Sequence, residues 1–330
     1  MTFRFGLLHS GKAIVLATAL FCFLLASIAS AGTINKNAGT TGFSFLKLGK
    51  GARAVAMGGA YTALIDDAST INYNPSGTAH LSGKKFLAGY HNYVLDVQSG
   101  FLVATMPVKN YGHGSVFIEY MNYGDFARTD NYGVVDINDP SFSGGDFLFG
   151  LNFARQFNPL LSAGMNVKFI SEFADGYSSQ ALAVDLGLLL SLPDSLTRVG
   201  LSVFNLGGVL SGFSANSDNP HKDKLPRWIR AGVAHSLREL PLLIALDAVL
   251  PNDNDPYFSV GIEFYKLQPL YLRLGYSTFG QNYKTGSDSD GLGGTSFGFG
   301  LDWKNYQFSY AFMPYLDLGS SHRVTVTGGF

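Results

Sequence analysis

Charged side chains are scarce in this sequence, and they recur on the polar faces of runs that are otherwise apolar. They make up 14% of the chain, whereas typical soluble domains contain roughly 25%. Those on the polar faces carry both signs: Glu119, Lys168, Asp185, Arg230, Asp247, Glu263, Arg273, Asp302 and Arg323. If these faces line the inside of a closed barrel, each charge must be solvated or paired, because an isolated buried charge is costly. Ion pairing across a lumen is therefore the chemistry that these residues offer.

A second group of polar residues lies in the segment 42–81, which is rich in small residues and has little alternation. We predict that this segment forms a plug whose charges pair with the barrel wall. Our hypothesis is that Arg53 contacts a wall carboxylate such as Asp247 or Glu263. The plug residues with a structural or gating role are Arg53, Met57, Gly58, Gly59, Asp66, Asp67, Asn74, Pro75 and Gly77. The alternative is that the charges form a polar path for a solute, or a latch that a ligand releases.

No constellation of catalytic residues stands out. The sequence has no His-Glu-x-x-His motif and no phosphate-binding glycine-rich loop. The seven histidines are scattered, and the neighbours His235 and Ser236 would point to opposite faces of a strand. The single cysteine, Cys22, lies in the apolar N-terminal run, so the rest of the chain has no disulfide or thiolate chemistry. We therefore expect no enzyme, no cofactor and no metal site, and the lack of a basic block argues against a nucleic-acid partner.

The first 31 residues have the features of a secretory signal peptide. Arg4 and Lys12 give a positive start, an apolar run covers residues 13–28, and small residues suit cleavage after Ala31. The alternative, an N-terminal membrane anchor, is disfavoured because the run is short for a spanning helix. We therefore predict that the protein is exported and that residues 1–31 are removed.

The plug follows the leader, and we place it at residues 32–83. Residues 51–57 can form one or two helical turns, and the glycine pair that follows ends them by allowing positive φ angles. Asp66-Asp67 predicts a cap or turn, and Asn74-Pro75 predicts the start of a turn. We expect the plug glycines to pack tightly against other backbone inside a narrow lumen.

The remainder of the chain, residues 84–330, contains about fourteen runs of strand-like length. The runs are 84–96, 98–109, 112–129, 145–157, 160–174, 179–192, 196–206, 227–237, 240–250, 256–266, 270–279, 295–304, 306–315 and 322–330. Phe297, Phe299 and Leu301, for example, alternate with small or polar residues. This is the apolar-out, polar-in pattern of a lipid-embedded barrel. The sequence therefore predicts an all-β fold, a fourteen-stranded antiparallel transmembrane barrel around the plug.

The connections between the runs support a barrel independently. Those after even-numbered runs are mostly short, whereas the long ones, at 130–144, 207–226 and 280–294, follow odd-numbered runs. Outer-membrane barrels have short turns on one side and long loops on the other. A soluble β-sandwich has no reason to keep this parity.

Aromatic residues near the ends of the runs suggest two further features. We expect interface girdles to be formed by Tyr120, Trp228, Tyr265, Trp303 and Tyr315. Phe330 ends the last run, which resembles the terminal aromatic that assembly machinery reads in many outer-membrane barrels. We therefore expect Phe330 to be an assembly signal, and barrel-assembly machinery to be a partner.

The plug motifs together resemble the signature of a known family. The N-terminal signature of the PorV/PorQ family, which is related to the FadL-type outer-membrane barrels, is similar to five stretches here: Phe45-Leu46-Lys47-Leu48, Gly51-Ala52-Arg53-Ala54, Met57-Gly58-Gly59-Ala60, Asp66-Asp67-Ala68 and Asn74-Pro75-Ser76-Gly77. Ser76 departs from the family, which usually has Ala there. The resemblance implies a fourteen-stranded barrel with its N-terminal segment folded inside. It also implies a link to type IX protein secretion, in which such proteins handle exported cargo at the cell surface.

We expect the protein in the bacterial outer membrane, with membrane lipid around the barrel. Two functions are consistent with this location. The first is an accessory or cargo-handling component of type IX-like secretion, with secreted proteins or secretion-system components as partners. The second is a FadL-like channel that takes up hydrophobic small molecules past a movable plug, and a purely structural barrel is a third possibility. The long loops favour the first because they are mostly polar; the apolar residues that we single out in them are Val134, Val135, Val209, Leu210 and Phe213.

Overall fold

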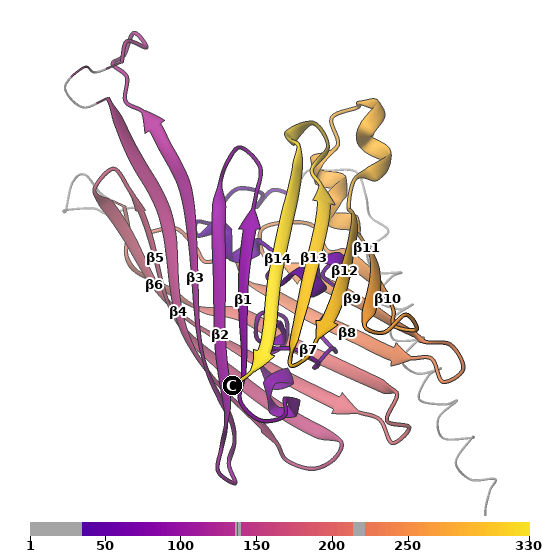
Figure 1. The fold of residues 1–330 in the computed structure, drawn as a ribbon. Coiled ribbons are helices and arrows are strands. Elements are labelled where there is room, and N and C mark those ends of the chain that lie inside the picture. Colours follow the sequence, from indigo (N-terminus) through magenta and orange to yellow (C-terminus); the bar gives the residue numbers. More distant parts are fainter. Residues whose placement is uncertain (1–34, 136, 138–139, 214–221) are drawn as a thin grey trace, which may run out of the picture.

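The computed structural model describes residues 35–135, 137, 140–213 and 222–330, so the predicted signal peptide and its cleavage at Ala31 lie outside the described residues. Fourteen strands close into one antiparallel barrel, in which consecutive strands pair and β1 pairs with β14 (Figure 1). The strands are β1 (Lys85–Asn92), β2 (Gln98–Val108), β3 (Gly112–Ala127), β4 (Ser141–Gln156), β5 (Leu161–Ala174), β6 (Tyr177–Ser191), β7 (Thr197–Ser211), β8 (Trp228–Ser236), β9 (Leu242–Pro251), β10 (Tyr257–Phe264), β11 (Leu270–Ser277), β12 (Thr295–Trp303), β13 (Tyr306–Pro314) and β14 (Ser320–Gly329). The predicted fourteen-stranded barrel is confirmed.

The alternation in the sequence decides which way each side chain points. In β6, Leu182, Leu186 and Leu188 are exposed on the outside, whereas Ala183 and Asp185 are buried inside. Successive side chains of a strand lie on opposite faces, so the large apolar side chains face outward and the small or polar side chains face the lumen. The result is an apolar outer surface around a polar lumen, the arrangement of a transmembrane barrel.

The predicted boundary of β7 is wrong. We expected the strand to end at residue 206 and residues 207–226 to form a loop, yet β7 continues to Ser211. The register of β7 against β6 shifts near Asn205, whose φ is 60°, so the ladder resumes after a bulge. At Gly207 a Cβ atom would come within 2.0 Å of the Leu182 carbonyl oxygen, so this glycine permits a close approach of two strands and does not mark a loop.

The two ends of the barrel differ, and we call them the loop end and the turn end. The loop end carries the connections of β3–β4, β7–β8 and β11–β12, the last with two short helices, η4 (Thr278–Tyr283) and η5 (Asp288–Leu292). The turn end carries the short connections and the C-terminus (Figure 1). The β3–β4 hairpin rises above its neighbours at the loop end (Figure 1).

The N-terminal segment lies inside the barrel (Figure 1). It contains η1 (Ser44–Lys47), α2 (Ala52–Ala56), η2 (Ala68–Asn72) and η3 (Pro75–His80). A further short helix, η6 (Leu316–Leu318), belongs to the β13–β14 loop. After α2 the chain turns at Gly58 and Gly59, with φ angles of 67° and 78°. Asp67 and Asn74 cap η2 and η3 by accepting hydrogen bonds from the backbone two residues ahead, as short polar side chains at such positions do. Within the described ranges, no helix is long and apolar enough to cross a membrane.

Glycines of the barrel wall make room for the plug. Lumen-facing glycines at which a Cβ atom would meet a plug atom at under 3 Å are Gly164, Gly187, Gly200, Gly232, Gly261, Gly275 and Gly298. Three pairs of them face each other directly across neighbouring strands: Gly164 and Gly187, Gly200 and Gly232, and Gly261 and Gly275. We call these seven residues the glycine band. Because they lack side chains, the plug backbone packs directly on the backbone of the wall.

We expect Gly275→Val to displace the plug. A Cβ atom at this position would lie 1.9 Å from the Gly58 amide nitrogen, which no rotamer change relieves. The variant should show a lower Tm in detergent and a higher single-channel conductance in planar bilayers.

Gly208→Val is the matched control, because a Cβ atom at Gly208 meets nothing within 4 Å. An unchanged conductance and Tm in Gly275→Val would show that the plug does not pack against β11.

Candidate functional site

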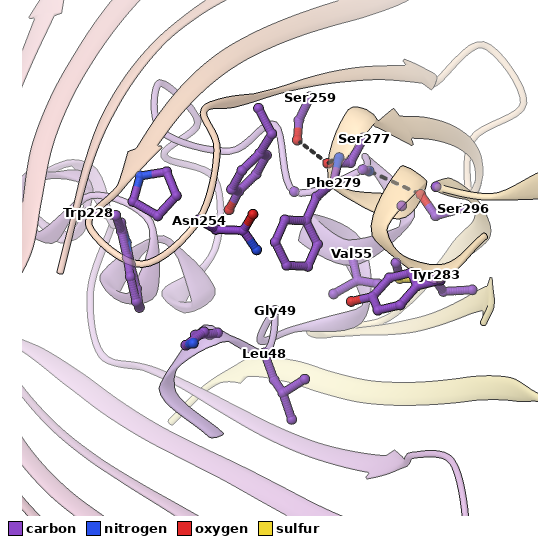
Figure 2. A pocket seen from close by; sticks show the side chains of 18 of the residues that line it. Leu48, Gly49, Val55, Trp228, Asn254, Ser259, Ser277, Phe279, Tyr283 and Ser296 are labelled. Carbon is purple, nitrogen blue, oxygen red and sulfur yellow. Dashed lines mark hydrogen bonds between the residues drawn. The ribbon is translucent and has the colours of Figure 1, made fainter. Parts of the chain in front are cut away.

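A cavity of about 170 Å³ lies between the plug and the loop end of the barrel. The plug borders it with Leu48, Val55 of α2, and the turn at Gly58 and Gly59. The barrel and its loops contribute the remaining lining residues used below: Trp228, Arg230, Tyr257, Phe279, Tyr283, Met313, Tyr315 and Arg323. Figure 2 shows Trp228 on one side of the cavity, Phe279 and Tyr283 on another, and Leu48 of the plug facing them. We call this space the loop-end cavity.

Aromatic rings form a continuous chain along the loop-end cavity. Tyr257 contacts Phe279 with ring centroids 5.0 Å apart, Phe279 contacts Tyr283 at 5.8 Å, and Tyr283 contacts Tyr315 at 4.9 Å. These tilted and edge-on contacts are the geometries that aromatic pairs prefer. Phe279 and Tyr283 come from η4, so the β11–β12 loop folds over the strand ends to complete this wall.

Part of the predicted interface girdle is wrong. Tyr315 is buried, Trp228 lines the loop-end cavity, and Tyr265 packs against a core cluster formed largely by plug residues. Trp228 and Tyr265 lie two residues from Arg230 and Glu263, so strand alternation places them on the same inward face. This two-residue spacing from a lumen charge is the sequence feature that could have identified both residues as inward-facing. Tyr120 and Trp303 are exposed.

Two tyrosines of the loops stay neutral phenols. Burial raises the pKa of Tyr283 well above its ordinary value, and neighbouring Tyr315 and Tyr93 act in the same direction. Burial also raises the pKa of Tyr93 in the β1–β2 loop. Both phenols are therefore uncharged at physiological pH.

A second cavity lies on the other side of the plug, at the turn end. Its volume is about 780 Å³, and polar and charged residues are prominent in its lining, among them Asp66, Asp67, Asp302 and Gln307. The plug thus separates an aromatic cavity at the loop end from a polar cavity at the turn end.

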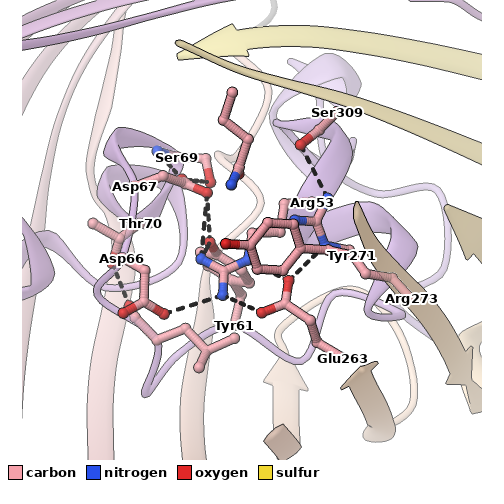
Figure 3. A network of polar contacts seen from close by, with 12 residues as sticks. Arg53, Tyr61, Asp66, Asp67, Ser69, Thr70, Glu263, Tyr271, Arg273 and Ser309 are labelled. Carbon is pink, nitrogen blue, oxygen red and sulfur yellow. Dashed lines mark hydrogen bonds and ion pairs between the residues drawn. The ribbon is translucent and has the colours of Figure 1, made fainter. Parts of the chain in front are cut away.

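Glu263 of β10 binds two guanidinium groups, one from the plug and one from the neighbouring strand (Figure 3). Arg53 of α2 donates from Nε to Glu263 Oε2 at 2.8 Å and from Nη2 to Oε1 at 2.6 Å. Arg273 of β11 donates from Nε to Glu263 Oε2 at 2.6 Å and from Nη1 to Ser309 at 3.0 Å. The two-pronged contact is the strongest geometry for an arginine and a carboxylate. Of the two carboxylates that the sequence suggested for Arg53, the structure places Glu263 against it.

The same guanidinium reaches two plug carboxylates. Arg53 Nη2 lies 3.1 Å from Asp66 Oδ2, and Nη1 lies 3.8 Å from Asp67 Oδ2. Tyr61 donates its hydroxyl to Asp67 at 2.7 Å and accepts from Arg53 at 3.3 Å. Figure 3 shows these residues converging on Arg53. Asp66 is the exposed member of the network and opens to the turn-end cavity.

Asp247 of β9 is the second anchor, and it binds plug backbone. Its Oδ2 atom accepts hydrogen bonds from the amides of Tyr61 and Thr62 at 3.0 and 3.1 Å. Arg230 of β8 donates to the same oxygen at 3.0 Å and to the Gly59 carbonyl at 2.5 Å. Arg230 also lies over the ring of Tyr73, 5.0 Å from its centroid. This wall pair thus fixes the turn that follows α2.

Amide side chains form a third anchor, which the sequence did not reveal. Asn152 donates to the Pro75 carbonyl at 3.1 Å, and Asn166 donates to the Ile71 carbonyl at 3.0 Å. Asn74 of the plug donates to the Leu188 carbonyl of β6 at 2.9 Å. Two of these asparagines thus satisfy plug carbonyl groups from the wall, and Asn74 satisfies a wall carbonyl from the plug.

The other lumen charges make separate contacts, two of them as ion pairs. Lys50 of the plug contacts Glu119 at 2.9 Å, whereas Lys168 contacts Asp185 within the wall at 2.7 Å. Asp302 lies near the turn end and accepts hydrogen bonds from Tyr271 and Gln307. Arg323 donates to Ser321 at 2.8 Å.

The remaining plug residues act through packing. Met57 is buried against the wall at Gly261, and a Cβ atom at Gly77 would lie 2.1 Å from the Thr70 hydroxyl. Pro75 is the first residue of η3, where its fixed φ suits a helix start. Phe330 is exposed beside Phe86, with ring centroids 6.5 Å apart. Its role in assembly stays a prediction.

Residues 294–298 have the spacing Gly-x-Ser-x-Gly, but the serine holds the plug. Ser296 lies inside β12, where its hydroxyl accepts from the Gly58 amide at 3.1 Å and donates to the Ala56 carbonyl at 3.3 Å. A nucleophilic serine of this motif instead stands on a strand-to-helix turn. In the part of the chain that the structure describes, no group of three metal-ligating residues comes together.

Residues 23–171, a little under half of the chain, match UPF0164, an uncharacterised protein family. Over 168 residues the chain is 28% identical to a UPF0164 protein of Treponema pallidum (strain Nichols), covering 48% of this chain and 51% of the relative. The chain thus spans about half the length of the curated relative that it matches. The PorV/PorQ resemblance stays a prediction.

Solved structures with a similar fold include two toluene transporters. The Ralstonia pickettii toluene transporter TbuX has a TM-score of 0.58 at 14% identity, over 84% of this chain and 97% of its own. The Pseudomonas putida toluene transporter TodX has a TM-score of 0.58 at 16% identity, over 84% of this chain and 96% of its own. A Pseudomonas aeruginosa FadL homologue has a TM-score of 0.51 at 10% identity, over 91% of this chain and 100% of its own. The likeness shows a FadL-like barrel fold.

We expect Glu263→Gln to loosen the plug. The change leaves Arg53 with only plug carboxylates and leaves Arg273 without a carboxylate among the described residues. Removing one partner of a buried ion pair costs about 3–5 kcal/mol. Trypsin should then cleave within residues 42–81 of the folded protein in detergent, and the Tm should fall.

Asp175→Asn is the control, because it removes the carboxylate of an ion pair with Arg128 at the loop end, away from the plug. Equal protease resistance of Glu263→Gln and Asp175→Asn would contradict the anchoring role of Glu263.

Proposed function

We propose that the protein is an outer-membrane channel of the FadL-like type, which admits small hydrophobic molecules at the loop end. The observation that carries the proposal is the loop-end cavity, because aromatic rings line it and the plug closes its inner side. Ligand sites are typically concave and mostly apolar, with a few polar groups that fix orientation.

The size of the cavity limits the ligand. A cavity of about 150 Å³ lined by apolar side chains can hold benzene. The loop-end cavity, at about 170 Å³, therefore suits one six-membered ring with a small substituent. The toluene transporters that share the fold carry molecules of this size, which supports the proposal.

The location in the outer membrane rests on the surface of the barrel. Leucine and phenylalanine side chains on the outer face are exposed, for example Leu188 and Phe299. A band of this kind is stable only against lipid, and the predicted signal peptide would deliver the chain to that membrane.

Passage requires the plug to move. The plug lies between the two cavities and is held by Glu263 and Asp247 from strands β10 and β9. A ligand in the loop-end cavity touches the turn at Gly58 and Gly59, so it borders the segment that must shift.

Tryptophan fluorescence tests the proposal, because the chain has only two tryptophans. Trp303→Phe leaves Trp228 in the cavity as the single reporter, and we expect toluene to change its emission saturably in detergent. Trp228→Phe leaves Trp303, which is exposed at the turn end, and should give no saturable change. The lack of a saturable response in Trp303→Phe would contradict the proposal.

A role in protein secretion is the second candidate, and the tip of the β3–β4 hairpin favours it. Tyr132, Val134 and Ile137 are exposed there, on the hairpin that rises above the barrel (Figure 1). An exposed apolar cluster is a feature of protein-binding surfaces. It would engage secreted cargo as the PorV/PorQ resemblance implies.

A deletion strain separates the two candidates. If the protein handles cargo, exported proteins should accumulate in the periplasm, and a Tyr132→Asp, Ile137→Asp double variant should fail to restore secretion. If secretion is normal without the protein, the cargo role is excluded and the channel role is unaffected.

A further inference from the structure

The loop-end cavity contains a buried positive charge that has no counter-charge. Arg323 of β14 lines the cavity and is only 3% exposed. Its Nη1 atom donates to Ser321 at 2.8 Å, and its Nε atom is buried without a hydrogen-bond partner. In the described part of the chain, no carboxylate lies within ion-pair distance of this guanidinium.

The other charges around the cavity are balanced. Lys47 forms an ion pair with Asp253, and Arg230 pairs with Asp247 at 3.0 Å. Among the charged residues that line the cavity, Arg323 is therefore the one without an ion-pair partner in the described part of the chain. Trp228 adds a second donor, because its indole nitrogen is buried without a hydrogen-bond partner.

An unpaired buried guanidinium is costly unless an anion joins it. A carboxylate is well suited, since arginine presents parallel N–H groups that match its two oxygens. The aromatic chain and this charge line the same cavity, since Phe279, Tyr283 and Arg323 are all among its lining residues. One cavity thus combines apolar rings with one cationic group.

We propose that the loop-end cavity binds a small aromatic monocarboxylate, with the carboxylate on Arg323 and the ring among Phe279, Tyr283 and Trp228. This rests on the proposed channel function and narrows its ligand from any small hydrophobic molecule to an anionic one. The volume of about 170 Å³ accommodates a single ring with one such group. It has no room for a long acyl chain.

Benzoate is the probe, with benzamide and toluene as neutral molecules of similar size. We would measure binding to the full-length protein in detergent by Trp228 fluorescence in the Trp303→Phe background and by isothermal titration calorimetry. Benzoate should bind at least about tenfold more tightly than benzamide, because a hydrogen bond to a charged group is worth about 1.5–3 kcal/mol.

Arg323→Gln should remove this preference and leave toluene binding unchanged. Arg323→Lys keeps the charge and should retain a weaker preference for benzoate, which separates the charge from a folding defect. Arg155→Gln is the matched control, because it removes an exposed cation of β4 far from the cavity lining, and it should bind benzoate as the parent does.

The outcomes distinguish the two proposals. If toluene binds while benzoate and benzamide bind equally, the carboxylate specificity is overturned and the channel function stands. If neither toluene nor benzoate binds the parent protein, the channel function fails, and the ligand assignment fails with it. A benzoate preference that persists in Arg323→Gln would overturn the assignment of Arg323.

Discussion

An irregular chain segment inside a barrel must have its polar backbone groups and charges satisfied by the wall. Here Glu263 and Asp247 meet part of that requirement, one by binding the Arg53 side chain and the other by accepting two plug amides. The glycine band is the steric counterpart, because it brings the wall backbone close enough for these contacts. The shape of both cavities follows from where these contacts hold the plug.

We interpret the ion pairs as determinants of position more than of stability. Desolvating two charges offsets much of their attraction, so a buried pair adds little compared with an apolar contact of the same size. A misplaced plug, however, would separate Arg53 from Glu263 and remove the two plug amides from Asp247, which is costly for buried charges. The network therefore selects one position of the plug among those that packing alone would allow.

The two sides of the plug have different chemistry. Aromatic rings and one unpaired guanidinium border the loop-end cavity, whereas aspartates and lysines together border the turn-end cavity.

The barrel was predictable because a strand has a period of two and lipid faces only one side of the wall. Alternation alone placed Leu188 outside and Asp185 inside, and short local signals gave the turn at Gly58 and the caps at Asp67 and Asn74. The choice of Glu263 over Asp247 as the partner of Arg53 was not predictable, because it depends on how deep the plug sits. The aromatic cavity was also hidden, since Trp228 at the start of β8, Phe279 of the β11–β12 connection and Tyr315 of the β13–β14 connection are brought together only by barrel closure. Local periodicity thus determined the wall, and long-range closure decided what the lumen contains.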